Sequence, residues 1–203
     1  MRNNQPVTGH EYKLSPTDYL ISRTDLKGRI TFANRAFIDA SGYAAEELLG
    51  AAHNLVRHPD MPPEAFADLW LTIQAGRSWT GMVKNRRKNG DFYWVQANVT
   101  PIHRNGVTEG YMSVRREPDR AEVDQAGRIY RRILDGQASG LRILQGEVVS
   151  RGISDPIGSL RRIPIRRRIS VVATGAAMLS LGLGAVAWSA VAPLAAASSA
   201  PGW

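Results

Sequence analysis

Two Asn-Gly pairs, at residues 89–90 and 105–106, divide the stretch from residue 79 to residue 116 into three short runs rich in alternating apolar positions. Asn-Gly is the pair that best fits a type I′ turn, in which both central residues have positive φ. The pattern therefore predicts strands at 79–87, 92–102 and 110–116, joined by tight turns. This feature restricts the fold strongly, because strands joined by such turns must form an antiparallel sheet.

Two more strands are predicted upstream, at 19–23 and 30–33, around a turn in which Gly28 can adopt positive φ. Asn34 can then serve as the N-cap of a short helix. A longer helix is predicted from Pro63 to Ala75, where apolar residues recur at helical spacing. We therefore expect an α+β domain at residues 19–118, with a five-stranded antiparallel sheet and helices packed on one face.

The least ordinary run in the chain lies between the helical patterns, from His53 to Pro62. It holds two histidines, an arginine, an asparagine and an aspartate. A polar, basic and turn-rich insert of this kind suits a polar or anionic ligand held near the core. A solvated loop whose charges have no function is the alternative.

Alternation along the strand at 79–87 places Trp79, Val83 and Asn85 on the same face. If the two apolar residues face the core, the amide of Asn85 does so too, and leaving it unpaired would cost ~1–3 kcal/mol. Its partner could be backbone, water or the edge of a ligand. Small residues at inward positions would leave room for that ligand: Gly81, Ala97 and Ser113.

Positive charge is concentrated after the predicted domain. Residues 121–168 hold ten arginines, no lysine and five acids, which accounts for +5 of the formal net charge of +8. Several glycines and prolines interrupt this stretch, so we interpret 119–168 as a basic linker. Residues 1–18 form a polar N-terminal extension without the apolar region of a secretion signal.

Residues 169–197 contain no charged side chain, and these 29 residues exceed the roughly 20 that a bilayer requires. We expect a C-terminal transmembrane helix here, followed by a tail at 198–203. A buried core helix and a re-entrant hairpin are the alternatives. The arginines at 166–168 would keep the N-terminal domain in the cytoplasm, beside the inner membrane.

Several motifs resemble PAS domains: residues 25–30, Asn34, residues 41–50, residues 85–90 and Gly110-Tyr111-Met112. Within that superfamily, His53-Asn54, the run from Arg57 to Pro62 and Trp79 resemble the PAS domain of the bacterial aerotaxis-receptor family. The run from Arg57 to Pro62 is the most specific of these motifs. The resemblance is strong from Leu20 to Arg116 and weaker from there to the predicted span.

The resemblance implies a PAS fold that binds FAD without a covalent bond and whose redox state signals oxygen or electron-transport status. It implies FAD-binding or signalling roles for Asn34, Arg57, His58, Asp60 and Trp79, and it matches Asn85 to an asparagine that pairs with the flavin ring in the light-sensing LOV domains. With His53 and Tyr111 as further candidates, eight residues are expected to bind the cofactor. His53 stands where the light-sensing LOV domains carry their reactive cysteine, and the chain has no cysteine at all. Cysteinyl-adduct photochemistry is therefore excluded.

The chemistry of FAD can be matched to side chains. The dimethylbenzene edge of the flavin needs an apolar slot, for which Trp79, Val83 and Val95 are candidates. The pyrimidine edge needs an amide, for which Asn85 is the candidate. Charge-assisted hydrogen bonds from Arg57 to the diphosphate would contribute ~1.5–3 kcal/mol.

Other functions remain open. The domain could be a haem-binding PAS gas sensor, with His53 or His58 as axial ligand, or a PAS interaction module without a cofactor. We do not expect an enzyme, because no nucleophile, base and orienting residue form a recognisable set. Nor do we expect nucleic-acid binding, since arginines beside a span usually meet lipid headgroups.

The expected partners are FAD, the lipid bilayer, and a second copy of the chain or a signalling protein. Aerotaxis receptors continue beyond their anchor into a HAMP domain and a kinase-control region. This sequence ends at Trp203, so we expect any kinase control to pass through another protein.

Overall fold

The structure is a computed structural model of the chain, and it describes residues 4–150. The predicted membrane segment at 169–197, the tail at 198–203 and the part of the expected linker from 151 to 168 lie outside the described residues. Within residues 4–150, no helix combines the length and apolar character that crossing a membrane requires.

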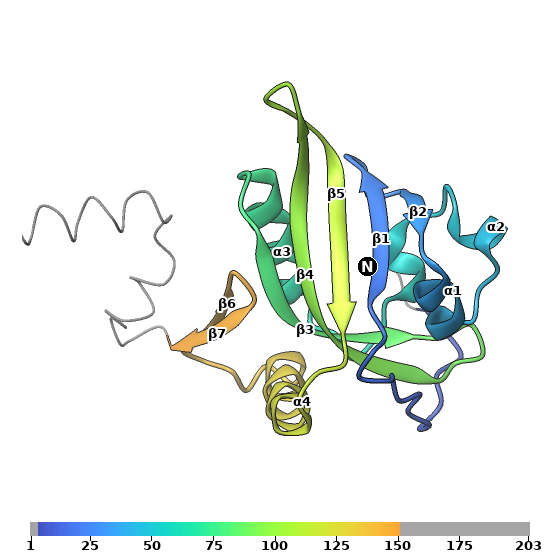
Figure 1. Ribbon diagram of the computed structural model, residues 1–203. Coiled ribbons are helices and arrows are strands. Elements are labelled where there is room, and N and C mark those ends of the chain that lie inside the picture. The colour runs from blue at the N-terminus through green and yellow to red at the C-terminus, as the bar shows by residue number, and fades with distance from the viewer. Residues whose placement is uncertain (1–3, 151–203) are drawn as a thin grey trace, which may run out of the picture. The chain divides into compact units, whose positions relative to one another are not determined.

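Five antiparallel strands form the sheet that the alternation predicted, in the order β2-β1-β5-β4-β3 (Figure 1). The first hairpin is therefore joined to the other three strands through the pairing of β1 with β5. The strands are β1 (Leu20–Asp25), β2 (Ile30–Ala33), β3 (Trp79–Arg86), β4 (Phe92–Arg104) and β5 (Val107–Arg116).

The two Asn-Gly turns differ from one another. The turn predicted at Asn105-Gly106 is confirmed between β4 and β5, and φ values of 52° and 81° are those of type I′. The type I′ turn expected at Asn89-Gly90 is wrong, because Gly90 has positive φ whereas Asn89 does not. The loop closes instead with a hydrogen bond from the N–H of Arg87 to the carbonyl of Asp91, while the Asn89 side chain binds Asp91.

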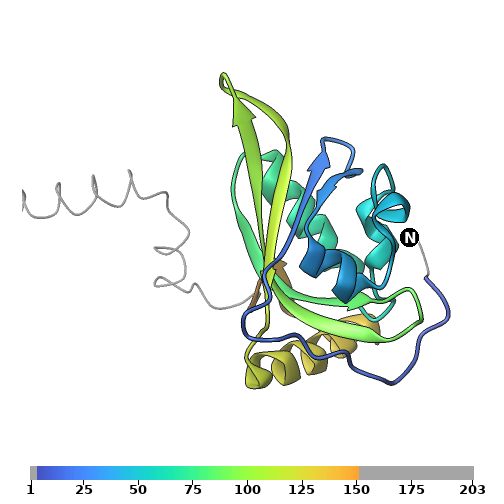
Figure 2. The ribbon, with the colours of Figure 1, turned by 45° about the vertical axis from the view of Figure 1, so that its right-hand side comes forward.

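Four helical segments lie on one side of the sheet (Figure 2): α1 (Arg35–Ser41), α2 (Ala45–Leu48), the short 3₁₀-helix η1 (His53–Val56) and α3 (Pro63–Gln74). The predicted cap is confirmed, since Oδ1 of Asn34 accepts from the N–H of Phe37 at 3.0 Å. The core lies between these segments and the sheet. Its largest enclosed side chains include Trp79, Tyr93, Phe37, Leu20 and Ile30.

The sequence suggested a linker after the sheet, but residues 120–134 form helix α4 (Arg120–Leu134). Val123, Ala126 and Tyr130 are buried, and the ring of Tyr130 stacks on Trp94 of β4 at 6.3 Å. The hydroxyl of Tyr130 also donates to the carbonyl of Met82 at 2.8 Å. Because Met82 and Trp94 alternate with the core residues of β3 and β4, α4 packs on the face opposite to the other helices.

A separate two-stranded hairpin follows, made of β6 (Leu141–Leu144) and β7 (Glu147–Ser150). Gln145 and Gly146 have φ values of 55° and 88°, so this too is a type I′ turn. The hairpin lies against α3 and β3, and Ile143 is buried there. This hairpin lies in the stretch that the sequence suggested to be a linker.

The described part of the N-terminal extension is attached to the domain. Nδ2 of Asn4 donates to the carbonyls of Asn54 and Arg57, both at 2.8 Å, and Arg86 donates to the carbonyl of Pro6 at 2.7 Å. These contacts hold the backbone of the loop that carries Arg57.

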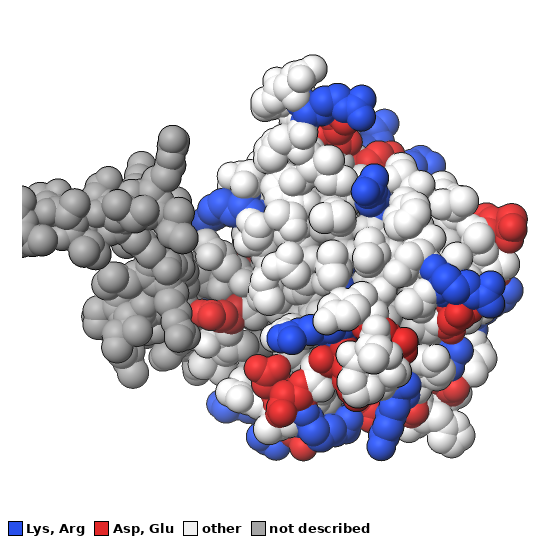
Figure 3. Space-filling view, in the orientation of Figure 1, with Lys and Arg blue, Asp and Glu red and all other residues white. Residues whose placement is uncertain are grey.

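The face of the sheet turned towards the viewer in Figure 3 is largely uncharged over β1, β5 and β4. Charged side chains gather mainly below it, where α4 lies. The single helix described on this face, α4, packs against β3 and β4.

Candidate functional site

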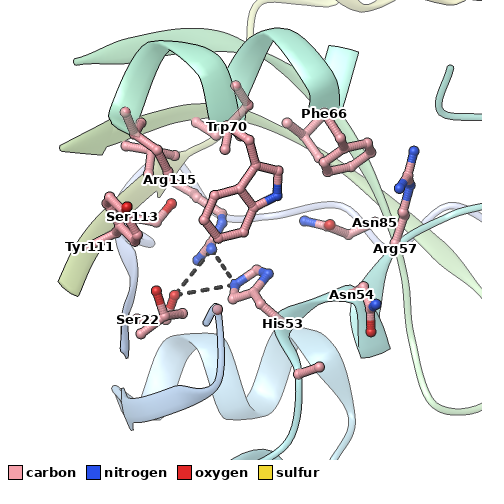
Figure 4. Close-up of a pocket in the computed structure, with 18 of the residues that line it drawn as sticks. Ser22, His53, Asn54, Arg57, Phe66, Trp70, Asn85, Tyr111, Ser113 and Arg115 are labelled. Atoms are coloured by element: carbon pink, nitrogen blue, oxygen red, sulfur yellow. Dashed lines mark hydrogen bonds between the residues drawn. The ribbon is translucent and has the colours of Figure 1, made fainter. Parts of the chain in front are cut away.

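A cavity of about 220 Å³ lies between the sheet and the helical segments (Figure 4). Side chains from β1, η1, α3, β3, β4 and β5 line it. Its apolar wall is supplied mainly by α3 and by the inward positions of the strands: Phe66, Leu69, Trp70, Ile73, Val83, Ala97 and Val99. A flat apolar ring system would suit such a wall.

Four polar side chains that line the cavity carry buried hydrogen-bonding atoms without a partner among the described residues. They are Nε and Nη2 of Arg57, Nδ2 of Asn85, Oγ of Ser113 and Nη1 of Arg115. All but the hydroxyl can only donate. Since most buried polar groups in native proteins are paired, this concentration of free donors marks a place for a ligand rich in acceptors.

Arg115 is the more enclosed of the two arginines, with 4% of its surface exposed. Its Nη2 donates to Oγ of Ser22 at 3.1 Å and to Nε2 of His53 at 2.6 Å. Burial lowers the pKa of Arg115 to about 10, so it stays charged at neutral pH. No salt bridge to Arg115 occurs within residues 4–150. A buried cation without a carboxylate partner favours a ligand that carries negative charge.

His53 is held neutral by its surroundings. Burial, with the charge of Arg115 as a second cause, lowers the pKa of His53 to about 3. Because Nε2 accepts a hydrogen bond from Arg115, the proton of the neutral ring is assigned to Nδ1. The ring also stacks on Phe37, with centroids 5.8 Å apart.

Arg57 follows η1, and its guanidinium carbon lies 3.6 Å from the centre of the Phe66 ring. Partial burial lowers the pKa of Arg57 to about 10. The backbones of Arg57 and Asn85 form an isolated antiparallel bridge. The loop predicted to bind a ligand therefore lies along the free edge of β3, beside the amide of Asn85.

Tyr111 and Trp70 form another part of the cavity lining. Their rings meet edge to face, with centroids 5.5 Å apart. Trp70 also lies against the turn between β1 and β2, where a Cβ on Gly28 would come within 3.1 Å of its indole. A glycine is required at that turn for this close approach as well as for its φ of 77°.

Of the eight predicted site residues, four line the cavity: His53, Arg57, Asn85 and Tyr111. Asn34 does not. Its amide caps α1, and its Nδ2 donates to the carbonyl of Tyr19 at 2.7 Å. Trp79 is also outside the lining, because its indole lies over Gly81 and donates to Asp68 at 2.8 Å. The space expected above Gly81 is therefore filled by Trp79.

His58 and Asp60 lie beside the cavity loop but not in the lining. Nδ1 of His58 accepts from the N–H of Asp60 at 3.1 Å, and Asp60 forms a 2.6 Å salt bridge with Lys84. Burial is the main cause that lowers the pKa of His58 to about 4. Burial is the largest single influence on Asp60 and works against its ionisation, but the hydrogen bond and charge of Lys84, with smaller contributions from His58 and Arg131, together lower its pKa.

Sequence reasoning missed Ser22 and Arg115 and treated Ser113 only as a small residue. A signal for Arg115 was present, because alternation along β5 puts Tyr111, Ser113 and Arg115 on one face. An arginine at an inward strand position requires a buried partner or a ligand. The burial of Arg115 and its hydrogen bond to His53 could be recognised only from the structure.

Comparison with known proteins identifies the domain. Residues 30–115 match the family described as the PAS fold. The chain is 42% identical over 194 residues to the aerotaxis receptor of Escherichia coli (strain K12), covering 96% of this chain and 37% of the receptor. It is 32% identical over 98 residues to a nitrogen fixation regulatory protein of Klebsiella pneumoniae, covering 48% of this chain and 20% of that protein.

A solved structure of the blue-light photoreceptor Aureochrome1 LOV is 18% identical and covers 60% of this chain and 93% of its own, with a TM-score of 0.48. The domain described above is a PAS domain. More closely, it is a PAS domain of the aerotaxis-receptor type. The chain spans little more than a third of that receptor's length.

Proposed function

We propose that this chain is a PAS sensor that binds FAD in the cavity and reports redox or oxygen status in signal transduction. The observation that carries the proposal is the set of unpaired donors of Arg57, Asn85 and Arg115 beside an apolar wall. A flavin ring has an apolar edge and an edge rich in acceptors, and a dinucleotide adds an anionic diphosphate. The residues present therefore fit this group.

Each side chain can be given a role. Asn85 would bind the pyrimidine edge, since its free Nδ2 is a donor and its amide oxygen can accept. Arg57, partly exposed and supported by Phe66, would bind the diphosphate. The enclosed Arg115 would favour any state of the ligand with more negative charge. We place only the flavin ring system in the cavity, because a volume of about 220 Å³ does not accommodate a whole dinucleotide.

When bound, the flavin would supply reversible electron transfer. The apolar wall of α3 and the strands would exclude water from the ring, which strengthens every electrostatic interaction with Arg115. A change in ligand charge next to that arginine can bias a two-state element of the protein. That is the physical basis of a redox sensor without an enzymatic reaction.

The haem alternative has weaker support. Nε2 of His53 accepts from Arg115, and His58 does not line the cavity. Neither imidazole thus offers the cavity an unengaged Nε2 as an axial ligand. The alternative of a module without cofactor would leave the four unpaired polar groups buried at a cost of about 1–3 kcal/mol each.

Titration of the flavin-free chain tests the proposal. FAD should bind saturably, with quenching of its fluorescence, and haem added in excess should not displace it. Stoichiometric haem binding, or the absence of any saturable FAD signal, would contradict the assignment. Riboflavin, which lacks phosphate, should bind more weakly than FAD if Arg57 meets the diphosphate.

We further propose that residues 169–197 anchor the chain in the inner membrane, with the PAS domain in the cytoplasm. The support is the uncharged 29-residue sequence and the three arginines that precede it. Carbonate washing should leave the chain in the membrane fraction, and its release would contradict the anchor. The signal would pass to a second copy of the chain or to another signalling protein.

A further inference from the structure

Helix α3 has two occupied faces. One face lines the cavity through Phe66, Leu69, Trp70 and Ile73. On another face Asp68, which is 8% exposed, holds the turn of the β6–β7 hairpin. The same helix thus contacts both the candidate cofactor site and the last described element of the chain.

The carboxylate of Asp68 is satisfied by three donors. Its Oδ1 accepts from the N–H of Gln145 at 2.9 Å, and its Oδ2 accepts from the N–H of Gly146 and from Nε1 of Trp79, both at 2.8 Å. No lysine or arginine within residues 4–150 forms a salt bridge with it. Asp68 is therefore a buried carboxyl group whose partners are mainly backbone amides of the hairpin turn.

The turn also fits closely against β3, the edge strand of the sheet. A Cβ on Gly146 would overlap the carbonyl of Thr80, and the glycine has a φ of 88°. Only glycine meets both requirements without movement of the turn. With four residues in each strand, β6–β7 is too small to be stable alone, so its structure depends on this docking.

We propose that the β6–β7 hairpin is a detachable output element, and that Asp68 couples its docking to the state of the cavity through α3. A shift of α3 that accommodates a ligand or a change in its charge moves Asp68 relative to β3 and loosens or tightens the turn. By linkage, release of the hairpin changes the affinity of the cavity by the same factor. The coupling of the hairpin to the ligand state of the cavity rests on the proposed function. The attachment of the hairpin to Asp68 and β3 does not.

Two substitutions release the hairpin by different routes. Asp68→Asn keeps one carbonyl oxygen but removes the charge and an acceptor. Gly146→Ala leaves the sequence of α3 unchanged and pushes the hairpin turn away from the carbonyl of Thr80. Gly140→Ala is the matched control, because Gly140 has a φ of 86° and no atom within 4 Å of an added Cβ. Asp124→Asn, on the exposed side of α4, controls for the loss of a charge.

Hydrogen exchange of the full chain in detergent, without flavin, provides the measurement. Amide exchange at Gln145 and Gly146 should become at least about tenfold faster in Asp68→Asn and Gly146→Ala. It should stay unchanged in Asp124→Asn and change clearly less in Gly140→Ala, which shares the positive-φ strain of Gly146→Ala but not its overlap with Thr80. Gly146→Ala should also accelerate exchange in α3. Unchanged exchange at the turn overturns the attachment, and unchanged exchange in α3 overturns the coupling.

The second arm uses FAD as the probe. Saturation of the unmodified chain with FAD should alter exchange at Gln145 and Gly146, and Gly146→Ala should alter FAD affinity at least about threefold. If FAD binds but neither quantity changes, the coupling to the cavity is wrong. If FAD does not bind, the proposed function fails, and the flavin-free arm still decides on the attachment and on its coupling to α3.

Discussion

Arg115 and His53 are joined by a 2.6 Å hydrogen bond from Nη2 to Nε2, at the border of the cavity (Figure 4). The bond fixes the imidazole as a neutral acceptor and leaves Nη1 of Arg115 without a protein partner among the described residues. A buried cation is thus oriented by a neutral base rather than neutralised by a carboxylate. This arrangement leaves most of its charge available to a ligand.

The depressed pKa of His53 predicts acid sensitivity. An unfolded histidine takes up a proton near pH 6.5, whereas folded His53 resists protonation down to about 3. The unfolded state binds more protons in this window, so stability is full above it and falls as the pH falls. The expected slope from His53 is about 1.4 kcal/mol per pH unit well below pH 6.5.

Urea unfolding of the flavin-free chain from neutral pH to about pH 5 measures this slope. His53→Gln retains an acceptor for Arg115 and should reduce the slope by roughly one proton's contribution. His103→Gln, at an exposed position, should leave it unchanged. An identical slope in His53→Gln and the unmodified chain would contradict the neutral state of folded His53.

Asn85→Leu should separate stability from ligand binding. The unpaired Nδ2 of Asn85 is costly in the flavin-free protein, so its replacement should leave stability unchanged or raise it by up to about 1 kcal/mol. FAD affinity should fall by about 1–3 kcal/mol, because the amide is lost to the ligand. Thermal unfolding with and without FAD measures both effects.

Asn98→Leu is the control for that experiment, since Asn98 is exposed on the other face of the sheet and binds Thr80. The FAD affinity of Asn98→Leu should match that of the unmodified chain. Retained FAD affinity in Asn85→Leu would remove Asn85 from the binding site.

Arg57→Ala should weaken FAD more than FMN. If Arg57 meets the diphosphate, FAD should lose about 1.5–3 kcal/mol of affinity and FMN clearly less. Fluorescence titrations with the two flavins make the comparison. Arg23→Ala is the control, since Arg23 also stacks on a phenylalanine, Phe32, at 5.6 Å but lies outside the cavity. Equal losses for both flavins would assign Arg57 a structural role.

Tyr130→Phe tests the docking of α4 on the outer face of β3 and β4. The variant loses the hydrogen bond to the carbonyl of Met82 and should be less stable by about 1 kcal/mol. Chemical denaturation measures the change. Tyr19→Phe, at a residue 55% exposed, should have no effect. If both variants unfold at the same denaturant concentration, α4 is not held as described.

The sheet was predictable because its signals are local. Alternation and turn residues determine β1 to β5, and the N-cap of Asn34 depends on a few neighbouring residues. The docking of α4 was missed because glycines, prolines and arginines suggested a linker. The apolar face of α4 consists of Val123, Ala126 and Tyr130. Its packing partner, Trp94 on the outer face of β4, is known only from the structure.

The candidate site also has some features with local sequence signals and others that depend on tertiary contacts. The loop from His53 to Pro62 and the amide of Asn85 were found from composition and alternation. Which loop side chains reach the cavity depends on the path of the backbone beside β3, so Arg57 lines it and His58 does not. Trp79 shares a strand face with Asn85, but the hydrogen bond to Asp68 turns its indole away.

The visible absorption spectrum of the purified chain, recorded before and after anaerobic reduction, tests the central claim most directly. The claim predicts the blue absorption of a bound flavin, reversible loss of this band on reduction, and release of FAD on denaturation. A Soret band from stoichiometric haem, or a protein that stays colourless after incubation with FAD, would contradict it.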